Sequence, residues 1–181
     1  MRRALIGVAV AALATLTLTS TATASSGHQV AHALTGQTVT NDNAPGDPTL
    51  CSPTAFVRYS SAGSGVLSHL GRVWFEISHC TYRTGPTTGK FDQGKITVTA
   101  ANGDKLFMNE FGTFVLTFDG SGAMSSVATV NVTITGGTGR FTHAGGSGHV
   151  MAVSTDLNKP KTSVTGTFYD TTITYDASDR R

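Results

Sequence analysis

The sequence is poor in charged residues. Asp, Glu, Lys and Arg make up 13% of its 181 residues, and no long run of Lys or Arg occurs in it. Of the 13 Lys and Arg residues, Arg2 and Arg3 lie in an amino-terminal segment that reads as an export signal, which leaves 11 to balance the 11 Asp and Glu residues. A near-neutral chain without a basic patch is not expected to bind nucleic acid or an anionic membrane.

Residues that favour helices are also scarce. Glu76 and Glu110 are the two glutamates, whereas Gly alone accounts for 21 residues and Thr and Ser are frequent. Glycine and serine are common in turns, and threonine is common in strands. The composition therefore predicts an all-β protein with many turns.

No hydrophobic run is long enough to be a convincing membrane span. The chain begins Met1-Arg2-Arg3, continues with apolar residues from Ala4 to about Leu18, and reaches Ala22-Thr23-Ala24. A basic start, a short apolar segment and an A-x-A site are typical of a secretory signal peptide. We expect residues 1–24 to be cleaved near Ala24 and the mature protein to be secreted.

Cysteine is limited to Cys51 and Cys80. In an exported chain an even pair of cysteines predicts one disulfide, which should stabilise the fold by roughly 3 to 4 kcal/mol in the chain-entropy model. The alternative is a catalytic thiol at Cys80 assisted by His79. This alternative is disfavoured because adjacent residues of a strand point to opposite faces.

Three segments follow the signal. Residues 25–50 are polar and show no apolar period, so we expect a flexible lead-in in which His28 and His32 are solvated. Residues 51–176 carry the strand patterns and are expected to form one domain, and residues 177–181 are a tail.

Period-two patterns recur through residues 51–176. Val73, Phe75 and Ile77 share one face of a strand, and Lys105 to Phe118 is one long strand or two strands broken near Gly112. Residues 61–65 and 101–104 are expected to be turns, the latter a type I′ hairpin turn at Asn-Gly. Seven or eight strands at this spacing predict an antiparallel barrel or sandwich.

A glycine-rich stretch lies at residues 134–146. Gly136, Gly137 and Gly139 allow the positive φ angles of a tight turn, after which Phe141 can re-enter the core. The phrase Gly136-Gly137-Thr138-Gly139-Arg140-Phe141, followed by Ala144 and Gly146, resembles the G-G-T/S-G-x-F-x-x-A-x-G signature of allene oxide cyclase-like and dirigent-like β-barrels. The chain resembles in particular the small exported bacterial members of that group.

The resemblance implies a single antiparallel eight-stranded β-barrel, often dimeric or trimeric, whose interior can hold a small apolar molecule. Dirigent proteins carry arginines around this motif, and the plant cyclases carry a carboxylate just after the phenylalanine. Here Thr142 and Gly145 occupy those positions. The chemistry of the family is therefore not carried over at this motif.

Glu110 is the best catalytic candidate. It has the same strand parity as Met108 and Phe114, so it points into the interior if the strand is unbroken. A buried carboxyl group holds its proton more tightly, which suits acid–base catalysis. The alternative is a bulge at Gly112 that turns Glu110 outward. Met108, Phe114 and Tyr169 are the candidates for a ligand cavity, although aromatic residues in small barrels more often form core.

Histidines give no metal motif. His69, His143 and His149 could gather at one end of the barrel, but no H-x-H or H-E-x-x-H spacing occurs. Surface histidines are expected, with no metal and no cofactor.

The leading hypothesis is a secreted barrel that binds a small apolar ligand or serves as a stable extracellular module without catalysis. The alternative is a cyclase or isomerase that acts on a reactive apolar intermediate inside the barrel, with Glu110 as its catalytic group. The resemblance also suggests a homo-oligomer.

Overall fold

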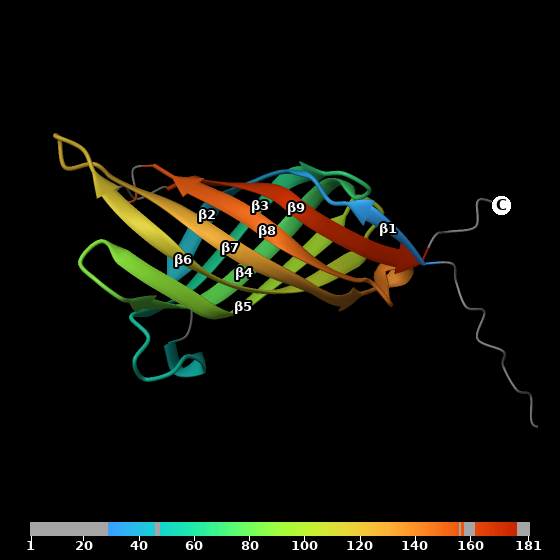
Figure 1. Cartoon of the computed structure of the whole chain (residues 1–181), viewed down its shortest axis with the longest axis horizontal. Helices are drawn as coiled ribbons and strands as arrows, with labels where there is room; N and C mark the ends of the chain where they lie inside the picture. The colour runs from blue at the N-terminus through green and yellow to red at the C-terminus, as the bar shows by residue number, and fades with distance from the viewer. Residues whose placement is uncertain (1–28, 46–47, 156, 158–161, 177–181) are drawn as a thin grey trace, which may run out of the picture.

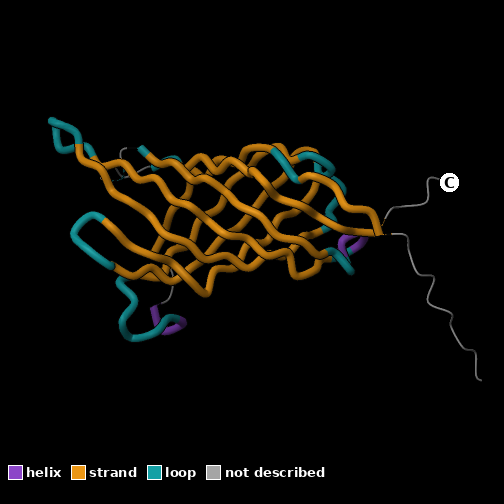
Figure 2. The backbone as a smooth tube through the Cα atoms, in the orientation of Figure 1, coloured by secondary structure: helices purple, strands orange, loops and turns teal. Residues whose placement is uncertain are grey.

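The structure is a computed structural model that describes residues 29–45, 48–155, 157 and 162–176. Most of these residues lie in strands (Figures 1 and 2). The strands are β1 (Gln29–Ala33), β2 (Gly36–Pro45), β3 (Val57–Leu67), β4 (Gly71–Arg83), β5 (Thr88–Ala100), β6 (Lys105–Phe118), β7 (Met124–Gly137), β8 (Gly145–Ser154) and β9 (Val164–Asp176). The two 3₁₀ turns are η1 (Pro48–Leu50) and η2 (Gly139–Phe141). Within the described ranges no helix has the length and apolarity needed to cross a membrane.

Antiparallel pairing of neighbours from β2 to β9 closes into a barrel, because β9 pairs with both β8 and β2. The ninth strand, β1, pairs with β9 beyond the end of β2, so β1 and β2 follow each other along the same partner. The prediction of a single antiparallel eight-stranded barrel is confirmed. The expected signal peptide and carboxy-terminal tail lie outside the described residues.

The expectation of a flexible lead-in over residues 25–50 is wrong for the described part of this segment. Residues 29–45 form β1 and β2 instead. The apolar period is missing from β2 because its described inward residues are Thr38 and Thr40, which are buried although polar. Threonine favours strands without producing an apolar alternation.

Two expected turns also differ. Residues 61–65 continue through β3, where a Cβ at Gly63 or Gly65 would overlap a carbonyl oxygen of β2. These glycines therefore permit a close approach of two strands rather than a turn. The turn at 101–104 forms, but among its residues only Gly103 has a positive φ, 89°. A type I′ turn needs two such residues, and here the Gly103 N–H donates to Ala100 O at 2.9 Å in a longer loop.

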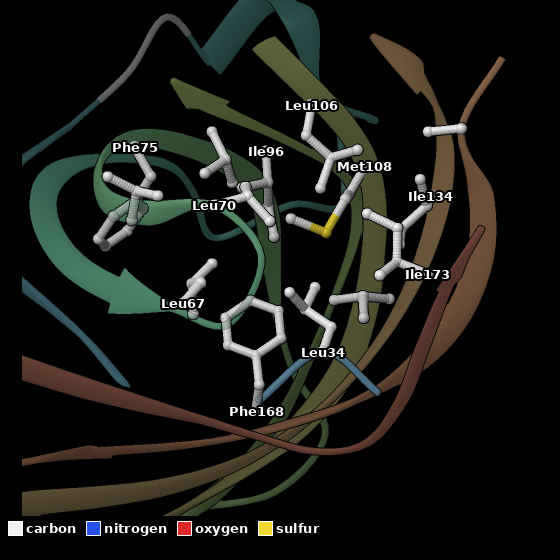
Figure 3. Close-up of a cluster of buried hydrophobic side chains, with 14 of the residues drawn as sticks. Leu34, Leu67, Leu70, Phe75, Ile96, Leu106, Met108, Ile134, Phe168 and Ile173 are labelled. Atoms are coloured by element: carbon white, nitrogen blue, oxygen red, sulfur yellow. The ribbon is translucent and has the colours of Figure 1, made fainter. Parts of the chain in front are cut away.

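One half of the barrel is filled by large apolar side chains (Figure 3). The fully buried members of this core include Leu34, Leu67, Leu106, Met108, Phe141 and Ile173. The side chain of Phe141 is 0% exposed, and it enters the core from η2. The η2 end of the barrel is therefore closed by side chains.

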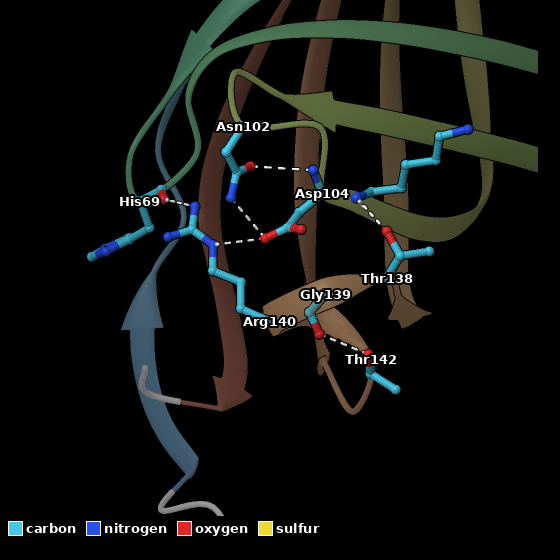
Figure 4. A network of polar contacts seen from close by, with 8 residues as sticks. His69, Asn102, Asp104, Thr138, Gly139, Arg140 and Thr142 are labelled. Carbon is cyan, nitrogen blue, oxygen red and sulfur yellow. Dashed lines mark hydrogen bonds and ion pairs between the residues drawn. The ribbon is translucent and has the colours of Figure 1, made fainter. Parts of the chain in front are cut away.

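The glycine stretch forms the turn at this closed end, as predicted. Gly136 and Gly139 have φ angles of 128° and 57°. Gly137 does not take the expected positive φ; it is needed instead because a Cβ there would overlap the carbonyl oxygen of Lys105. A Cβ at Gly139 would overlap the carboxylate of Asp104. The Arg140 guanidinium donates to His69 O at 2.6 Å and has its Nε 3.9 Å from Asp104 Oδ2 (Figure 4). Through Arg140, the turn between β7 and β8 thus contacts the β3–β4 and β5–β6 connections.

The predicted disulfide between Cys51 and Cys80 is present, with the two Cα atoms 5.7 Å apart. It fastens the segment after η1 to β4. This segment ends at Phe56, whose N–H donates to Thr81 O at 2.7 Å. The disulfide therefore holds Phe56 at the end of the barrel opposite η2.

Candidate functional site

The other half of the barrel contains a cavity of about 340 Å³. It lies toward the end where the β4–β5 loop, the β6–β7 turn and η1 are found, at the left of Figure 1. Its apolar lining comes from Phe56, Val57, Ile77, Pro86, Phe91, Phe114, Leu116, Met124, Ala128, Val130, Ala152, Leu157 and Val164. A smaller void of about 80 Å³ lies deeper, and Thr40, Ile77 and Glu110 line both spaces.

On β7 and β8 the inward side chains become smaller toward this end, which leaves room for the cavity. Along β7, inward positions change from Ile134 and Val132 in the closed half to Ala128 and Ser126 at the cavity. The same gradient occurs in β8, which presents Val150, Ala152 and Ser154 in that order. Small residues at the inward positions leave the space that large ones fill elsewhere.

A histidine–glutamate pair lies in this apolar wall. Nδ1 of His79 is 2.6 Å from Oε1 of Glu110, and the two side chains are 17% and 1% exposed. When Glu110 is ionised its carboxylate can only accept a hydrogen bond, and Nδ1 of His79 is then the donor. Nε2 is then the ring nitrogen that remains for a ligand.

Two aromatic rings fix the orientation of His79. Tyr59, its cross-strand partner in β3, stacks on the imidazole with centroids 5.5 Å apart and planes at 13°. Phe91 of β5 stacks with centroids 4.7 Å apart and planes at 29°. Both aromatic residues also line the cavity. The imidazole is therefore held by packing as well as by its bond to Glu110.

A bulge in β5 makes this arrangement possible. Gln93 has a positive φ of 52°, and the pairing with β6 shifts between Phe91 and Gly94. The extra residue lets both Phe91 and Gly94 face the interior. A Cβ at Gly94 would overlap Cγ of Glu110, and a Cβ at Gly112 would approach the ring of Phe91. The two glycines therefore leave room for the pair and its aromatic support.

Tyr59 is a further polar residue of the cavity wall, which also includes Thr40, Ser61, Thr81, Arg83, Thr88, Ser126 and Ser154. Burial raises the pKa of Tyr59 to about 12. Its hydroxyl therefore keeps its proton at neutral pH and can donate a hydrogen bond into the cavity.

The structure brings some of the predicted site residues to the cavity and places others elsewhere. Glu110 faces the interior, as an unbroken β6 requires, and no shift in the pairing of β6 with β7 occurs at Gly112. Phe114 lines the cavity. Met108 belongs instead to the packed core, where it is 1% exposed. Tyr169 does not line the cavity but stacks on His149, with centroids 5.5 Å apart.

The histidines considered for a metal are not brought together. His143 Nδ1 lies 2.9 Å from Asp176 Oδ2, whereas the ring of His69 packs on His32 with centroids 4.4 Å apart. His149 packs on Tyr169. Among the described residues no group of three His, Cys, Asp or Glu side chains could hold a metal ion.

His79, Tyr59 and Phe91 were missed as site residues. The signal for His79 was present, because it shares strand parity with Val73, Phe75 and Ile77 on the inward face. Phe91 could not be found in this way, because the bulge at Gln93 reverses the parity of β5.

Comparisons with known proteins add little to this geometry. The sequence matches no protein-family model and no curated protein. A solved structure of pyocyanin demethylase is similar at 16% sequence identity and a TM-score of 0.37, covering 76% of this chain and 100% of that chain.

Proposed function

We propose that the barrel binds a small, mostly apolar molecule in its hollow half. The observation that carries the proposal is a mostly apolar cavity of about 340 Å³ with one buried hydrogen-bonded pair, His79–Glu110, in its wall. Ligand sites in proteins are typically apolar cavities of about 300–1,000 Å³ with a few polar groups that orient the ligand. The ligand would bury its apolar part among the lining residues and direct a polar group to Nε2 of His79.

The proposal also includes secretion of the protein and a distant relationship to a family of β-barrels. A signal peptide at residues 1–24 would export the chain, and the disulfide between Cys51 and Cys80 is compatible with an oxidising compartment. The glycine turn and the eight-stranded barrel support membership among the allene oxide cyclase-like and dirigent-like barrels. A homo-oligomer, as in that group, is part of the same proposal.

Titration with N-phenylnaphthylamine, a neutral probe that fluoresces in apolar surroundings, tests the binding. We expect the purified protein to bind the probe. Ala152→Phe should weaken binding by about tenfold or more, because it fills the cavity. Met151→Phe is the matched control, since Met151 is the adjacent residue and its side chain is exposed. Absent binding, or equal binding by the two variants, would refute the proposal.

A second candidate function is catalysis of an isomerisation or cyclisation inside the barrel. It is favoured by one observation, the position of Glu110 against the cavity with His79 as its partner. Loss of turnover in Glu110→Gln with ligand binding retained would distinguish catalysis from binding alone.

A further inference from the structure

We infer that His79 is a general base that removes a proton from the carbon next to a carbonyl group of an apolar ligand, with Glu110 positioning His79 and Tyr59 donating to the carbonyl oxygen. The inference rests on the proposed ligand cavity and names the substrate class: a small apolar ketone or aldehyde that can enolise.

The geometry of His79 and Glu110 supports a basic role. Nδ1 of His79 lies 2.6 Å from Glu110 Oε1, and when it donates to the ionised carboxylate the lone pair of the imidazole is on Nε2. When Nε2 accepts a proton, the carboxylate stabilises the imidazolium that forms. Because Glu110 is 1% exposed, water screens this attraction only weakly. Glu110 acts through His79 and is a positioning residue.

Tyr59 is placed to stabilise the other end of the reacting group. It lies directly opposite His79 across the β3–β4 pair, and both side chains line the cavity. A carbonyl oxygen and the carbon that loses its proton are two bonds apart in one molecule. A ligand can therefore present the C–H group to one strand and the oxygen to the other. A protonated tyrosine in an apolar wall is a suitable donor to a developing oxyanion.

The step balances without a cofactor. The C–H bond breaks, its proton moves to Nε2 of His79, and its electron pair forms the C=C bond of an enolate as the carbonyl π electrons move to oxygen. The proton on Nε2 is replaced from solvent, so delivery of a solvent deuteron to the same carbon gives exchange. Delivery to a conjugated carbon gives a shifted double bond. No thiol nucleophile competes, because neither cysteine in the described part of the chain is free.

Deuterium exchange of β-tetralone, a bicyclic ketone that enolises, provides the test. Exchange at the carbon next to the carbonyl is followed by NMR in D₂O. We expect the wild-type protein to accelerate exchange about a hundredfold or more over buffer, within the usual range of general-base catalysis. His79→Gln should return exchange to the buffer rate, and Tyr59→Phe and Glu110→Gln should each lower it by about tenfold or more. His149→Gln on the outer surface should leave it unchanged.

Binding of N-phenylnaphthylamine, measured in the same variants, separates the two claims. Retained probe binding with no exchange by the wild-type protein overturns this inference and leaves the proposed binding function intact. Failure of the wild-type protein to bind the probe refutes that function itself. A test that needs no variant is competition: saturating probe should stop the exchange. Exchange that persists under saturation places the reaction outside the cavity and overturns the inference.

Discussion

The His79–Glu110 pair is placed where charge is least stabilised by water. Paired charges inside a protein contribute little net stability, because desolvation offsets their attraction, but loss of one partner leaves the other unsatisfied. A buried pair in a mostly apolar wall is therefore more readily explained by a role in binding or chemistry than by stability. The consequence can be measured directly.

Glu110→Leu should lower the free energy of unfolding by about 1–3 kcal/mol, because the Nδ1–H of His79 loses its acceptor. The double variant His79→Leu/Glu110→Leu should regain most of this loss, since both polar groups are then absent. Urea denaturation of the two variants and the wild-type protein gives the comparison. A double variant less stable than the single one would show that the pair itself stabilises the fold.

The hydroxyl group of Tyr59 should lose its proton at a higher pH than an exposed tyrosine does. Burial raises its pKa from 10.0 to about 12, so the folded protein holds this proton more tightly than the unfolded chain does. Its contribution to stability is complete below pH 10 and is lost as the pH rises toward about 12. In an alkaline titration followed by phenolate absorbance, Tyr59→Phe should remove a phase near pH 12. Removal of a phase near pH 10 instead would contradict the burial of this hydroxyl.

At the scale of single strands, the bulge in β5 determines the site. It turns Phe91 toward His79 and Gly94 toward Glu110. The sequence did not reveal it, because Asp92 and Gln93 interrupt the apolar alternation of this strand. By contrast, the alternation through β6 placed Glu110 correctly on the face of Met108 and Phe114.

Gly94→Ala should destabilise the protein by about 1–3 kcal/mol, because the added methyl group meets Cγ and the backbone oxygen of Glu110. Gly120→Ala is the control, since no atom lies within 4 Å of the Cβ it would add. Thermal unfolding of both variants measures the difference. Equal stability would mean that β5 and β6 can separate without penalty at this position.

The disulfide acts on the segment that carries Phe56. Replacing Cys51 and Cys80 by alanine removes a cross-link between residues 29 positions apart. We expect a loss of about 3–4 kcal/mol in the chain-entropy model. Guanidinium denaturation measures the loss. We also expect faster release of the fluorescent probe, because Phe56 lines the cavity. Unchanged release would show that this segment does not restrict access.

At the scale of the whole molecule, the barrel divides into a packed half and a hollow half. The period-two patterns predict seven or eight strands in a barrel or a sandwich, and the closed eight-stranded barrel was implied by the resemblance at the glycine turn. Strand β2 was missed because its buried threonines are polar. The hollow half could have been predicted from β7, where inward residues decrease in size from Ile134 to Ser126. The cavity volume itself could not have been predicted from the sequence, because it depends on how the side chains of all eight strands pack together.

The central claim is that the hollow half of the barrel is the ligand site. Methyl NMR spectra recorded during titration with N-phenylnaphthylamine test it most directly, because adjacent residues of one strand report on opposite faces. We expect the methyl signals of Ala128 and Ala152, which line the cavity, to shift strongly, and those of the exposed Val127 and Val153 to shift little. The packed core at Leu106 should also stay unchanged. Shifts confined to Val127 and Val153 would place the ligand on the outer surface and contradict the claim.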